Sequence, residues 1–441
     1  MMDMISTVRA ALGAGLVAVA LMSGAPALAL EIQDLKSPEG AVFWLVHEPS
    51  IPIVALEISF AGGARLDPED RAGLANLLGG MIEEGSGELD AVGFSKARDD
   101  LSARFRFSAG RDSMEVSARM LVETLEPSVE LLAAALASPR FDPEPMERVK
   151  AQILSSIAES ASKPETVASE TWYAATFPQH SYGRSTDGTA ESVVSITRDD
   201  LIAARARLLT RANARIGIVG AIDAEQAGLM VDTVLAGLEN GTPLVRQRVG
   251  DTPPPGLQVI AMDVPQSAAI FGHAGLTRDD PDFIPAYVMN YILGGGGFSS
   301  RLMQEVREKR GLAYGIYSYL AVREESALYL GSVQTANAGM AETLEVIRAE
   351  WARMAAEGAT ADELDRAIRY QTGTFPLSFD SNSKIANYLV FIQETDLGID
   401  YIDRRNDLIE AVTLADVRRV AARLLKPDEL SIVVVGKPAG L

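Results

Sequence analysis

The sequence predicts an α+β fold of two homologous domains, in each of which helices cover a mostly antiparallel sheet. In both halves of the chain, β-rich runs occur in pairs and are mixed with amphipathic helical patterns. A helix-then-strand unit at 197–220 recurs at 413–436 with one constant offset, which indicates a duplicated domain. The length of 441 residues is sufficient for two domains, each with its own core.

The first 29 residues have the pattern of a secretory signal peptide. Arg9 provides the positive region, residues 10–22 form an apolar core, and Ala27-Leu28-Ala29 fits a small-x-small cleavage site. The apolar run is too short to favour the alternative, an uncleaved membrane anchor. We therefore expect a signal peptide over 1–29 and a periplasmic mature protein that is free of the membrane after cleavage.

The first domain is expected over residues 30–238. Runs 42–46 and 53–60 are β-rich and predict a hairpin, and Gly110-Arg111-Asp112 predicts a turn between two alternating strands. Leu74, Leu77, Leu78 and Met81 lie at helical spacing and indicate a helix. The expected strands are 42–46, 53–60, 97–109, 113–120 and 214–219, and the expected helices are 67–84, 121–137, 144–160, 197–209 and 224–238.

Residues 239–256 form the predicted linker, since they contain Asn240-Gly241 and three consecutive prolines, which favour extended backbone. The second domain is expected over 257–441. Its expected strands are 259–262, 267–273, 314–322, 327–333 and 432–435, and its expected helices are 281–293, 341–357, 361–373, 383–394, 401–410 and 413–425.

The net charge of −20 argues against nucleic acid and anionic membranes as partners. The chain contains no cysteine, which excludes disulfides, thiolate catalysis and thiolate-bound zinc. Its 47% hydrophobic content provides for a sizeable core.

Residues 294–319 carry the most informative pattern. Four glycines, Gly294, Gly295, Gly296 and Gly297, predict a mobile loop, and a short helix is expected over 299–310. Gly311 is placed to end that helix with a positive φ. The guanidinium of Arg307 and the hydroxyl of Tyr314 are donors that can bind a peptide carbonyl or the oxyanion that forms from it. The alternative is that both residues are ordinary surface side chains.

The motifs Ser300-Arg301-Leu302, Arg307-Glu308-Lys309 and Gly311-Leu312-Ala313-Tyr314 resemble the carboxy-terminal half of the pitrilysin/insulinase family. These inverzincin-type zinc peptidases include the mitochondrial processing peptidases. The resemblance implies two homologous α+β domains. It also implies that Arg307 and Tyr314 form a substrate-binding pair, and that the glycines form a substrate loop like the one in the non-catalytic processing-peptidase subunit.

Catalytic members of this family carry H-x-x-E-H on a helix of the first domain, where two His bind zinc and the Glu acts on water. The matching positions here are Asn76, Gly79 and Gly80, and the position of the third ligand falls near Ser156. His47, His180 and His273 show no ligand spacing. We therefore expect no metal site and no cofactor in this chain.

A specific second-domain motif, combined with a first-domain zinc motif that lacks its functional residues, resembles the non-catalytic subunit of a heterodimeric peptidase. The implied partner is a homologous H-x-x-E-H catalytic subunit that holds the zinc, and the implied ligand is a peptide substrate. The alternative is a zinc-less scaffold or peptide-binding protein with no peptidase role. A third possibility is self-association of two zinc-less chains.

Overall fold

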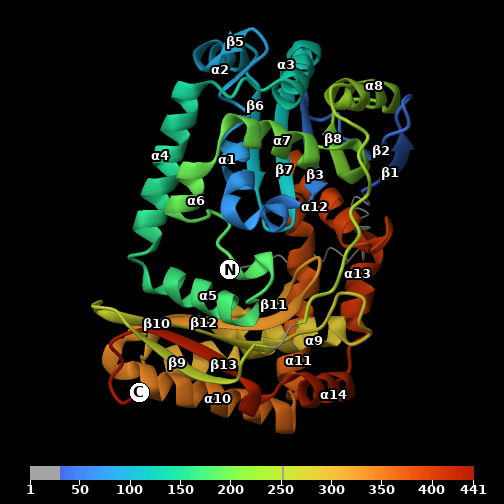
Figure 1. Ribbon diagram of the computed structural model, residues 1–441. Helices are drawn as coiled ribbons and strands as arrows, with labels where there is room; N and C mark the ends of the chain where they lie inside the picture. The colour runs from blue at the N-terminus through green and yellow to red at the C-terminus, as the bar shows by residue number, and fades with distance from the viewer. Residues whose placement is uncertain (1–29, 251–252) are drawn as a thin grey trace, which may run out of the picture. The chain divides into compact units, whose positions relative to one another are not determined.

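The computed structural model describes residues 30–250 and 253–441 (Figure 1). Residues Ile32–Leu441 form one compact unit, the second of the two units of the chain. The predicted signal peptide lies outside the described residues. No helix in the described ranges is long and apolar enough to cross a membrane.

The first half of the second unit contains six main strands and eight α-helices among the described residues. The strands of its large sheet are β1 (Gln33–Lys36), β2 (Val42–His47), β3 (Ile53–Ala61), β6 (Arg104–Ala109), β7 (Ser113–Leu121) and β8 (Ala214–Gly220). A small hairpin pairs β4 (Gly85–Ser86) with β5 (Leu89–Asp90). The helices are α1 (Leu74–Met81), α2 (Ala91–Asp100), α3 (Leu125–Ala137), α4 (Pro143–Ser160), α5 (Pro164–Thr176), α6 (Ala190–Ser195), α7 (Arg198–Leu208) and α8 (Ala224–Leu235).

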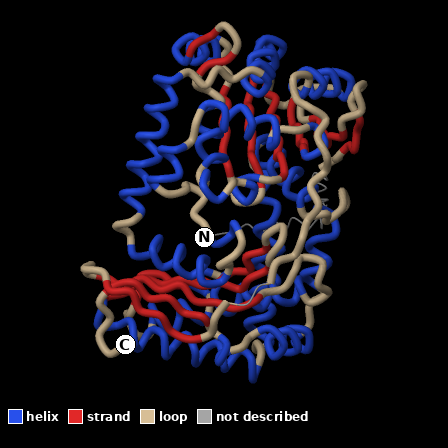
Figure 2. The backbone as a smooth tube through the Cα atoms, in the orientation of Figure 1, coloured by secondary structure: helices blue, strands red, loops and turns tan. Residues whose placement is uncertain are grey.

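The second half contains a five-stranded sheet and six α-helices in the described part. Its strands are β9 (Gly256–Ala261), β10 (Gln266–Ala274), β11 (Ala313–Val322), β12 (Ala327–Ala336) and β13 (Ser431–Gly436). Its helices are α9 (Phe283–Asn290), α10 (Met340–Glu357), α11 (Ala361–Thr374), α12 (Asn382–Glu394), α13 (Tyr401–Glu410) and α14 (Leu414–Leu424). Figure 2 shows its strands side by side in one layer, with helices covering a face.

The two sheets have the same topology. The first has the order β1-β2-β8-β3-β7-β6 and the second β11-β12-β10-β13-β9. Apart from the additional edge strand β1, the two orders correspond when read from β2 and from β9, with β8 between β2 and β3 and β13 between β9 and β10. Only β2–β8 and β13–β9 are parallel pairs in these sheets. The predicted α+β class, with two homologous and mostly antiparallel domains, is therefore confirmed.

The predicted hairpin of residues 42–46 and 53–60 is wrong, because β8 lies between β2 and β3 and pairs with both. The second half repeats this arrangement, with β13 between β9 and β10. The physical reason is that the side chains of β8 are buried from Ile216 to its end, and so apolar a strand is most stable in the interior of a sheet.

Two predicted elements begin several residues later than expected. The helix expected from 67 begins at Leu74, because Gly73 adopts a left-handed conformation with φ of 91° and the Asp67 carboxylate accepts hydrogen bonds from the Gly73 and Ala75 N–H groups, each at 3.1 Å. The strand expected from 97 begins at Arg104 instead. Residues 91–100 form α2, which is capped by the Asp90 carboxylate.

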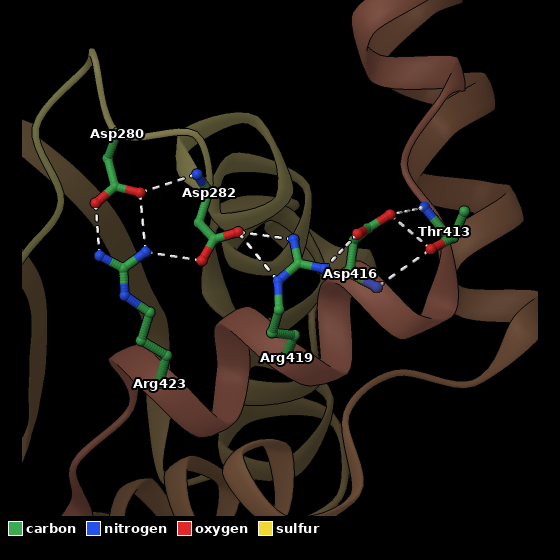
Figure 3. A network of polar contacts seen from close by, with 6 residues as sticks. All are labelled: Asp280, Asp282, Thr413, Asp416, Arg419 and Arg423. Carbon is green, nitrogen blue, oxygen red and sulfur yellow. Dashed lines mark hydrogen bonds and ion pairs between the residues drawn. The ribbon is translucent and has the colours of Figure 1, made fainter.

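The duplicated helices α7 and α14 each begin with a capping box, which satisfies backbone N–H groups of the first turn. In α14 the capping residues continue into a larger polar network (Figure 3). Arg423 binds both carboxylate oxygens of Asp280, at 2.9 and 2.6 Å, and Arg419 donates to Asp282 at 2.7 Å. The Thr413 hydroxyl and then Arg419 hold the pKa of Asp416 at about 2. The network anchors α14 to the segment that leads into α9.

The two halves exchange helices. Helix α5 of the first half packs on β10 and β13, and α12 of the second half packs on β3 and β8. Figure 1 shows α5 on the face of the second sheet opposite to α10. The indole N–H of Trp172 on α5 donates to the Ser431 carbonyl at 3.1 Å. The apolar residues of this contact form a separate buried core that includes Trp172, Phe177, Ile270 and Val433.

Close approach of α12 to β8 depends on Gly217. A Cβ at this position would lie 2.6 Å from the Ala386 carbonyl oxygen and 3.1 Å from Leu389 Cβ. Both neighbours belong to α12, and one of them is backbone, so neither can move aside without displacing the helix. A side chain at position 217 would therefore separate α12 from the sheet.

We expect Gly217→Ala to lower the free energy of unfolding by about 1–3 kcal/mol, the usual range for overpacking a core contact. Gly373→Ala is the matched control, because Gly373 lies in α11 with no atom within 4 Å of the added Cβ. It should be neutral or stabilising, since alanine is the better helix former. Urea denaturation of both variants measures the difference. Equal stabilities would contradict the role of Gly217.

The polar face of the first sheet contains a buried carboxylate. Glu57 on β3 is 8% exposed, lies between Gly217 and Ser117 on its neighbouring strands, and accepts a hydrogen bond from the Ser117 hydroxyl. Burial raises the pKa of Glu57 to about 7, with a smaller contribution from the nearby Glu115 charge. Because the folded pKa exceeds the unfolded value, the stability that neutral Glu57 provides is present at acidic pH and is lost as pH rises towards 7.

Glu57→Gln should therefore raise the free energy of unfolding at pH 8, because the amide keeps the shape of the side chain and removes the buried charge. The gain at pH 8 should exceed the effect at pH 4 by up to about 1–3 kcal/mol. Thermal unfolding at the two pH values tests this. Glu130→Gln on the exposed face of α3 is the control and should show no such pH-dependent gain. The same gain in both variants would point to net charge as the cause.

Candidate functional site

Arg307 and Tyr314 lie next to each other in the structure. The family resemblance implies that these two residues act as a pair. Arg307 lies in the π-helical turn η8 (Met303–Glu308), and Tyr314 lies at the start of β11. The guanidinium carbon of Arg307 is 4.6 Å from the centre of the Tyr314 ring and 4.5 Å from the centre of the Phe298 ring. Arg307 is thus stacked between two aromatic rings, and we call Phe298, Arg307 and Tyr314 the arginine sandwich.

The sandwich leaves its donors accessible. Tyr314 is 86% exposed, and the side chain of Arg307 is 26% exposed. Besides the rings, the Arg307 guanidinium contacts only Glu308 among the described residues, with Nε 3.5 Å from Oε1. Stacking fixes the plane of a guanidinium and leaves its N–H groups free at the edges. The sandwich can therefore present a planar fork and a phenol to a carbonyl oxygen.

The local fold explains this geometry. Gly311 ends the helical turn with φ of 63°, as predicted, and its N–H donates to the Arg307 carbonyl at 2.9 Å. Directly afterwards, the pairing of β11 with β12 shifts between Ala313 and Ile316. Such a bulge changes the direction of the side chains within it. Tyr314 lies in this irregular part of the strand and points to solvent, above the buried Ala313 and Ile316.

The glycines differ from the predicted mobile loop. Gly294 and Gly295 belong to the π-helical turn η6 (Tyr291–Gly295), and only Gly296 and Gly297 lie outside it. A Cβ on Gly294 would collide with Ser318 on β11, and one on Gly295 would lie 2.6 Å from the Asn290 amide nitrogen. The loop prediction is therefore wrong for Gly294 and Gly295, where the absence of a side chain permits close packing. Gly297, with φ of 54° and open space around it, begins the short 3-10 helix η7 (Gly297–Ser299), and the mobility of this segment stays a prediction.

A groove of about 580 Å³ adjoins the sandwich on the open face of the second sheet. Its aromatic wall consists of Tyr314, Tyr317 and Tyr319 on β11, and Glu165 of α5 lies at its border. Tyrosine offers apolar area together with a polar tip, which suits contacts with peptide side chains and backbone. Sequence reasoning missed Phe298 and this groove, because both depend on contacts between elements. The only signal was the alternation of tyrosines after Gly311.

The positions of the zinc motif cannot hold a metal. Asn76 is turned towards Asp187 and donates to its carboxylate at 3.1 Å. Gly79 and Gly80 provide no ligand atom, and a Cβ on Gly80 would lie 2.9 Å from Val149 of α4. Ser156 is exposed on α4. The described residues contain no group of His, Cys, Asp or Glu side chains that could bind a metal ion.

Each histidine has a structural contact instead. His47 Nδ1 lies 2.8 Å from the Ile222 carbonyl. His180 Nε2 lies 3.2 Å from the Glu325 carboxylate. His273 accepts from the Trp351 indole at 3.0 Å, and its burial lowers its pKa, which favours the neutral ring. The three rings lie in separate elements and do not form a site.

Comparisons with known proteins agree with this description. The family model described as insulinase (peptidase family M16) matches residues 42–190, and the model of the peptidase M16 inactive domain matches residues 195–370. The non-peptidase homologue YmxG of Helicobacter pylori is 23% identical, over 93% of this chain and 95% of that protein. An uncharacterised zinc protease of Mycobacterium tuberculosis is 27% identical, over 91% of this chain and 92% of its own length.

Solved structures share the fold across both halves. The crystal structure of a peptidase M16 inactive domain from Pseudomonas fluorescens matches with a TM-score of 0.88 and 29% identity, covering 93% of this chain and 99% of that one. A chain of complex III2 from Candida albicans matches with a TM-score of 0.76 over 92% of this chain and 96% of its own, but at 14% identity it shows the fold alone. Both family models match, the fold is shared, and the positions of the zinc motif carry no metal ligands. The chain therefore belongs to the insulinase family of peptidases, among its inactive members.

Proposed function

We propose that this chain is the non-catalytic subunit of a heterodimeric zinc peptidase. In this proposal, a homologous H-x-x-E-H subunit provides the metal and the catalytic base. This chain binds the peptide and stabilises the charge that develops on its carbonyl oxygen. The metal chemistry belongs to the partner, because the equivalent positions of this chain carry no ligands.

The arginine sandwich is the observation that supports the proposal. The Tyr314 hydroxyl is the exposed donor for the carbonyl oxygen that becomes the oxyanion. Arg307, held in plane by Phe298 and Tyr314, donates to a neighbouring backbone carbonyl of the peptide. The tyrosine-lined groove beside the sandwich provides surface for the side chains of the same peptide. Fixed donors of this kind need little reorganisation when the charge develops.

A scaffold or peptide-binding role without peptidase activity is the second candidate. The name of the Helicobacter pylori relative, a non-peptidase homologue, favours it. The two candidates differ in what Tyr314 does. A scaffold needs only the shape of the surface, whereas a peptidase subunit needs the hydroxyl group. A homodimer that binds peptides without cutting them is a variant of this second candidate.

We also propose that the mature protein is periplasmic, since the pattern of residues 1–29 is that of a cleaved signal peptide. The partner subunit is then expected in the same compartment. An acidic mature chain without cysteine is compatible with that environment.

Adding this chain to an H-x-x-E-H partner from the same host should create a peptidase activity that neither has alone. Tyr314→Phe should then lower turnover by on the order of 10²–10³, the usual cost of removing an oxyanion donor. Arg307→Lys should raise KM and lower turnover, because lysine keeps the charge but loses the planar fork. Cleavage of a fluorogenic peptide by the reconstituted pair measures both effects.

Tyr370→Phe is the matched control, since Tyr370 is an exposed tyrosine of α11 outside the groove and sandwich. Co-purification with the partner shows whether each variant still assembles. Unchanged turnover of an assembled Tyr314→Phe pair would contradict the oxyanion role. Failure of every H-x-x-E-H protein of the host to pair would favour the scaffold.

For export, we expect the protein isolated from its native host to begin at Leu30 and to fractionate with the periplasm. Cleavage follows Ala29 because small residues occupy the two positions that signal peptidase requires. Mass spectrometry of the intact protein determines the first residue. Ala27→Leu should block processing, whereas Leu28→Val, at the tolerant middle position, should not. Cytoplasmic protein with an intact Met1 would refute the proposal.

A further inference from the structure

A second groove lies on the open face of the first sheet and has a different chemical character. It measures about 620 Å³ and covers β6 and β7, beside the region where α12 lies on β3 and β8. Four arginines line it: Arg98, Arg104, Arg106 and Arg119. The groove is thus the counterpart of the tyrosine groove on the second sheet, with arginines in place of tyrosines.

Three of these arginines form no direct ion pair in the described part of the chain, although Arg106 lies close enough to Glu83 for its charge to lower the pKa of that carboxyl against the effect of burial. Arg98 pairs with Glu83 at 2.8 Å and with Asp99 at 3.4 Å. Arg104, Arg106 and Arg119 are exposed, and their guanidinium groups form no ion pair or hydrogen bond within the described ranges. On a chain with a net charge of −20, acidic side chains could easily have provided partners. Arg104, Arg106 and Arg119 therefore form a local basic surface on an acidic protein.

The sheet register adds to the charge. Arg104 on β6 lies directly opposite Arg119 on β7, and like charges in such cross-strand positions destabilise a sheet. An anion between the two guanidinium groups would relieve this repulsion. The hydroxyls of Ser102 and Ser383 line the same groove and can add donors, whereas the Ser117 hydroxyl already donates to Glu57. The acidic side chains at the groove are Asp99, which already pairs with Arg98, and the buried Glu57.

The spacing indicates an extended ligand. Arg104 and Arg106 alternate with the apolar Phe105 and Phe107, which pack towards the core, so both arginines lie on the open face. Residues two apart on a strand are separated by roughly 6.6–6.8 Å. An extended polypeptide has the same repeat. Since β6 is the last strand of the sheet, no further strand flanks the groove on that side.

We propose that this groove binds an extended acidic segment of a polypeptide, with carboxylates from alternate residues on Arg104 and Arg106 and a further contact to Arg119. The site is separate from the arginine sandwich and goes beyond the proposed peptidase role, because binding requires only this chain. Nucleic acid fits the observations less well, since the overall charge of −20 repels a long polyanion.

The test is fluorescence anisotropy with the purified chain and a labelled peptide in which Glu alternates with Ser over one strand length. We expect binding that weakens as salt increases, and at least about tenfold weaker binding when every Glu is replaced by Gln. A peptide of the same composition with its Glu residues contiguous should bind more weakly than the alternating one. Competition with a single-stranded oligonucleotide tests the other polyanion.

Arg104→Ser/Arg106→Ser should weaken binding of the alternating peptide by about tenfold or more. Arg348→Ser is the matched control, because Arg348 is an exposed arginine of α10 without a partner in the described part of the chain. Arg104→Glu/Arg106→Glu should reverse the preference towards an alternating Lys peptide. Circular dichroism checks folding, and Arg119→Ser alone provides a milder variant.

Three results would overturn the proposal: equal affinity for the Glu and Gln peptides, equal losses in the groove and control variants, or an oligonucleotide that binds at least as tightly as the peptide. None of these results bears on Tyr314, since the peptidase partner is absent from the assay. Failure here and failure of the proposed function can therefore be distinguished.

Discussion

The exchange of α5 and α12 between the two halves is the interaction on which the rest of the structure depends. Each helix leaves its own half and packs on the sheet of the other, α5 on β10 and β13 and α12 on β3 and β8. The α5 contact buries a core of its own around Trp172, whose indole N–H is satisfied by the Ser431 carbonyl. Burial of aromatic side chains provides most of the stabilisation at such contacts. The α12 contact depends instead on close approach, which Gly217 permits.

Because each exchanged helix covers only the inner strands of a sheet, the outer strands keep an open face. Two grooves result, one over β10, β11 and β12 and one over β6 and β7. The duplication thus produced two related surfaces, and the side chains on them have diverged. Tyrosines and the arginine sandwich occupy one surface, and arginines occupy the other.

A second set of contacts between the halves is polar. Arg65 of the first half pairs with Glu325, in the turn between β11 and β12, at 3.1 Å, and His180 lies 3.2 Å from the same carboxylate. Both Arg65 and Glu325 are nearly buried, so each charge depends on its partner to offset desolvation. These polar contacts hold the turn after β11, the strand that carries Tyr314. The position of the candidate site is thus linked to the same interface as the exchanged helices.

The sequence alone was sufficient for properties that depend on neighbouring residues or on a repeat. The α+β class and the duplication followed from periodicity and from a constant offset. The turn at Gly311 followed from the need for positive φ. The loss of zinc ligands at Asn76, Gly79, Gly80 and Ser156 followed from aligning these residues with the motif that the family resemblance implies. The pairing of Arg307 with Tyr314 came from a family resemblance and could not be derived from spacing.

Only the tertiary structure decided which strands are neighbours and which side chains meet across elements. β8 takes its place between β2 and β3 because burial of a whole strand outweighs the short connection that favoured a hairpin. Gly294 and Gly295 are required by packing against Ser318 and Asn290, which local sequence does not encode. Phe298 completes the arginine sandwich, and Arg104 faces Arg119, through contacts between elements. Such contacts depend on the register and packing of segments that are far apart in the sequence. Neighbouring residues do not encode them, and they form only when the whole chain folds.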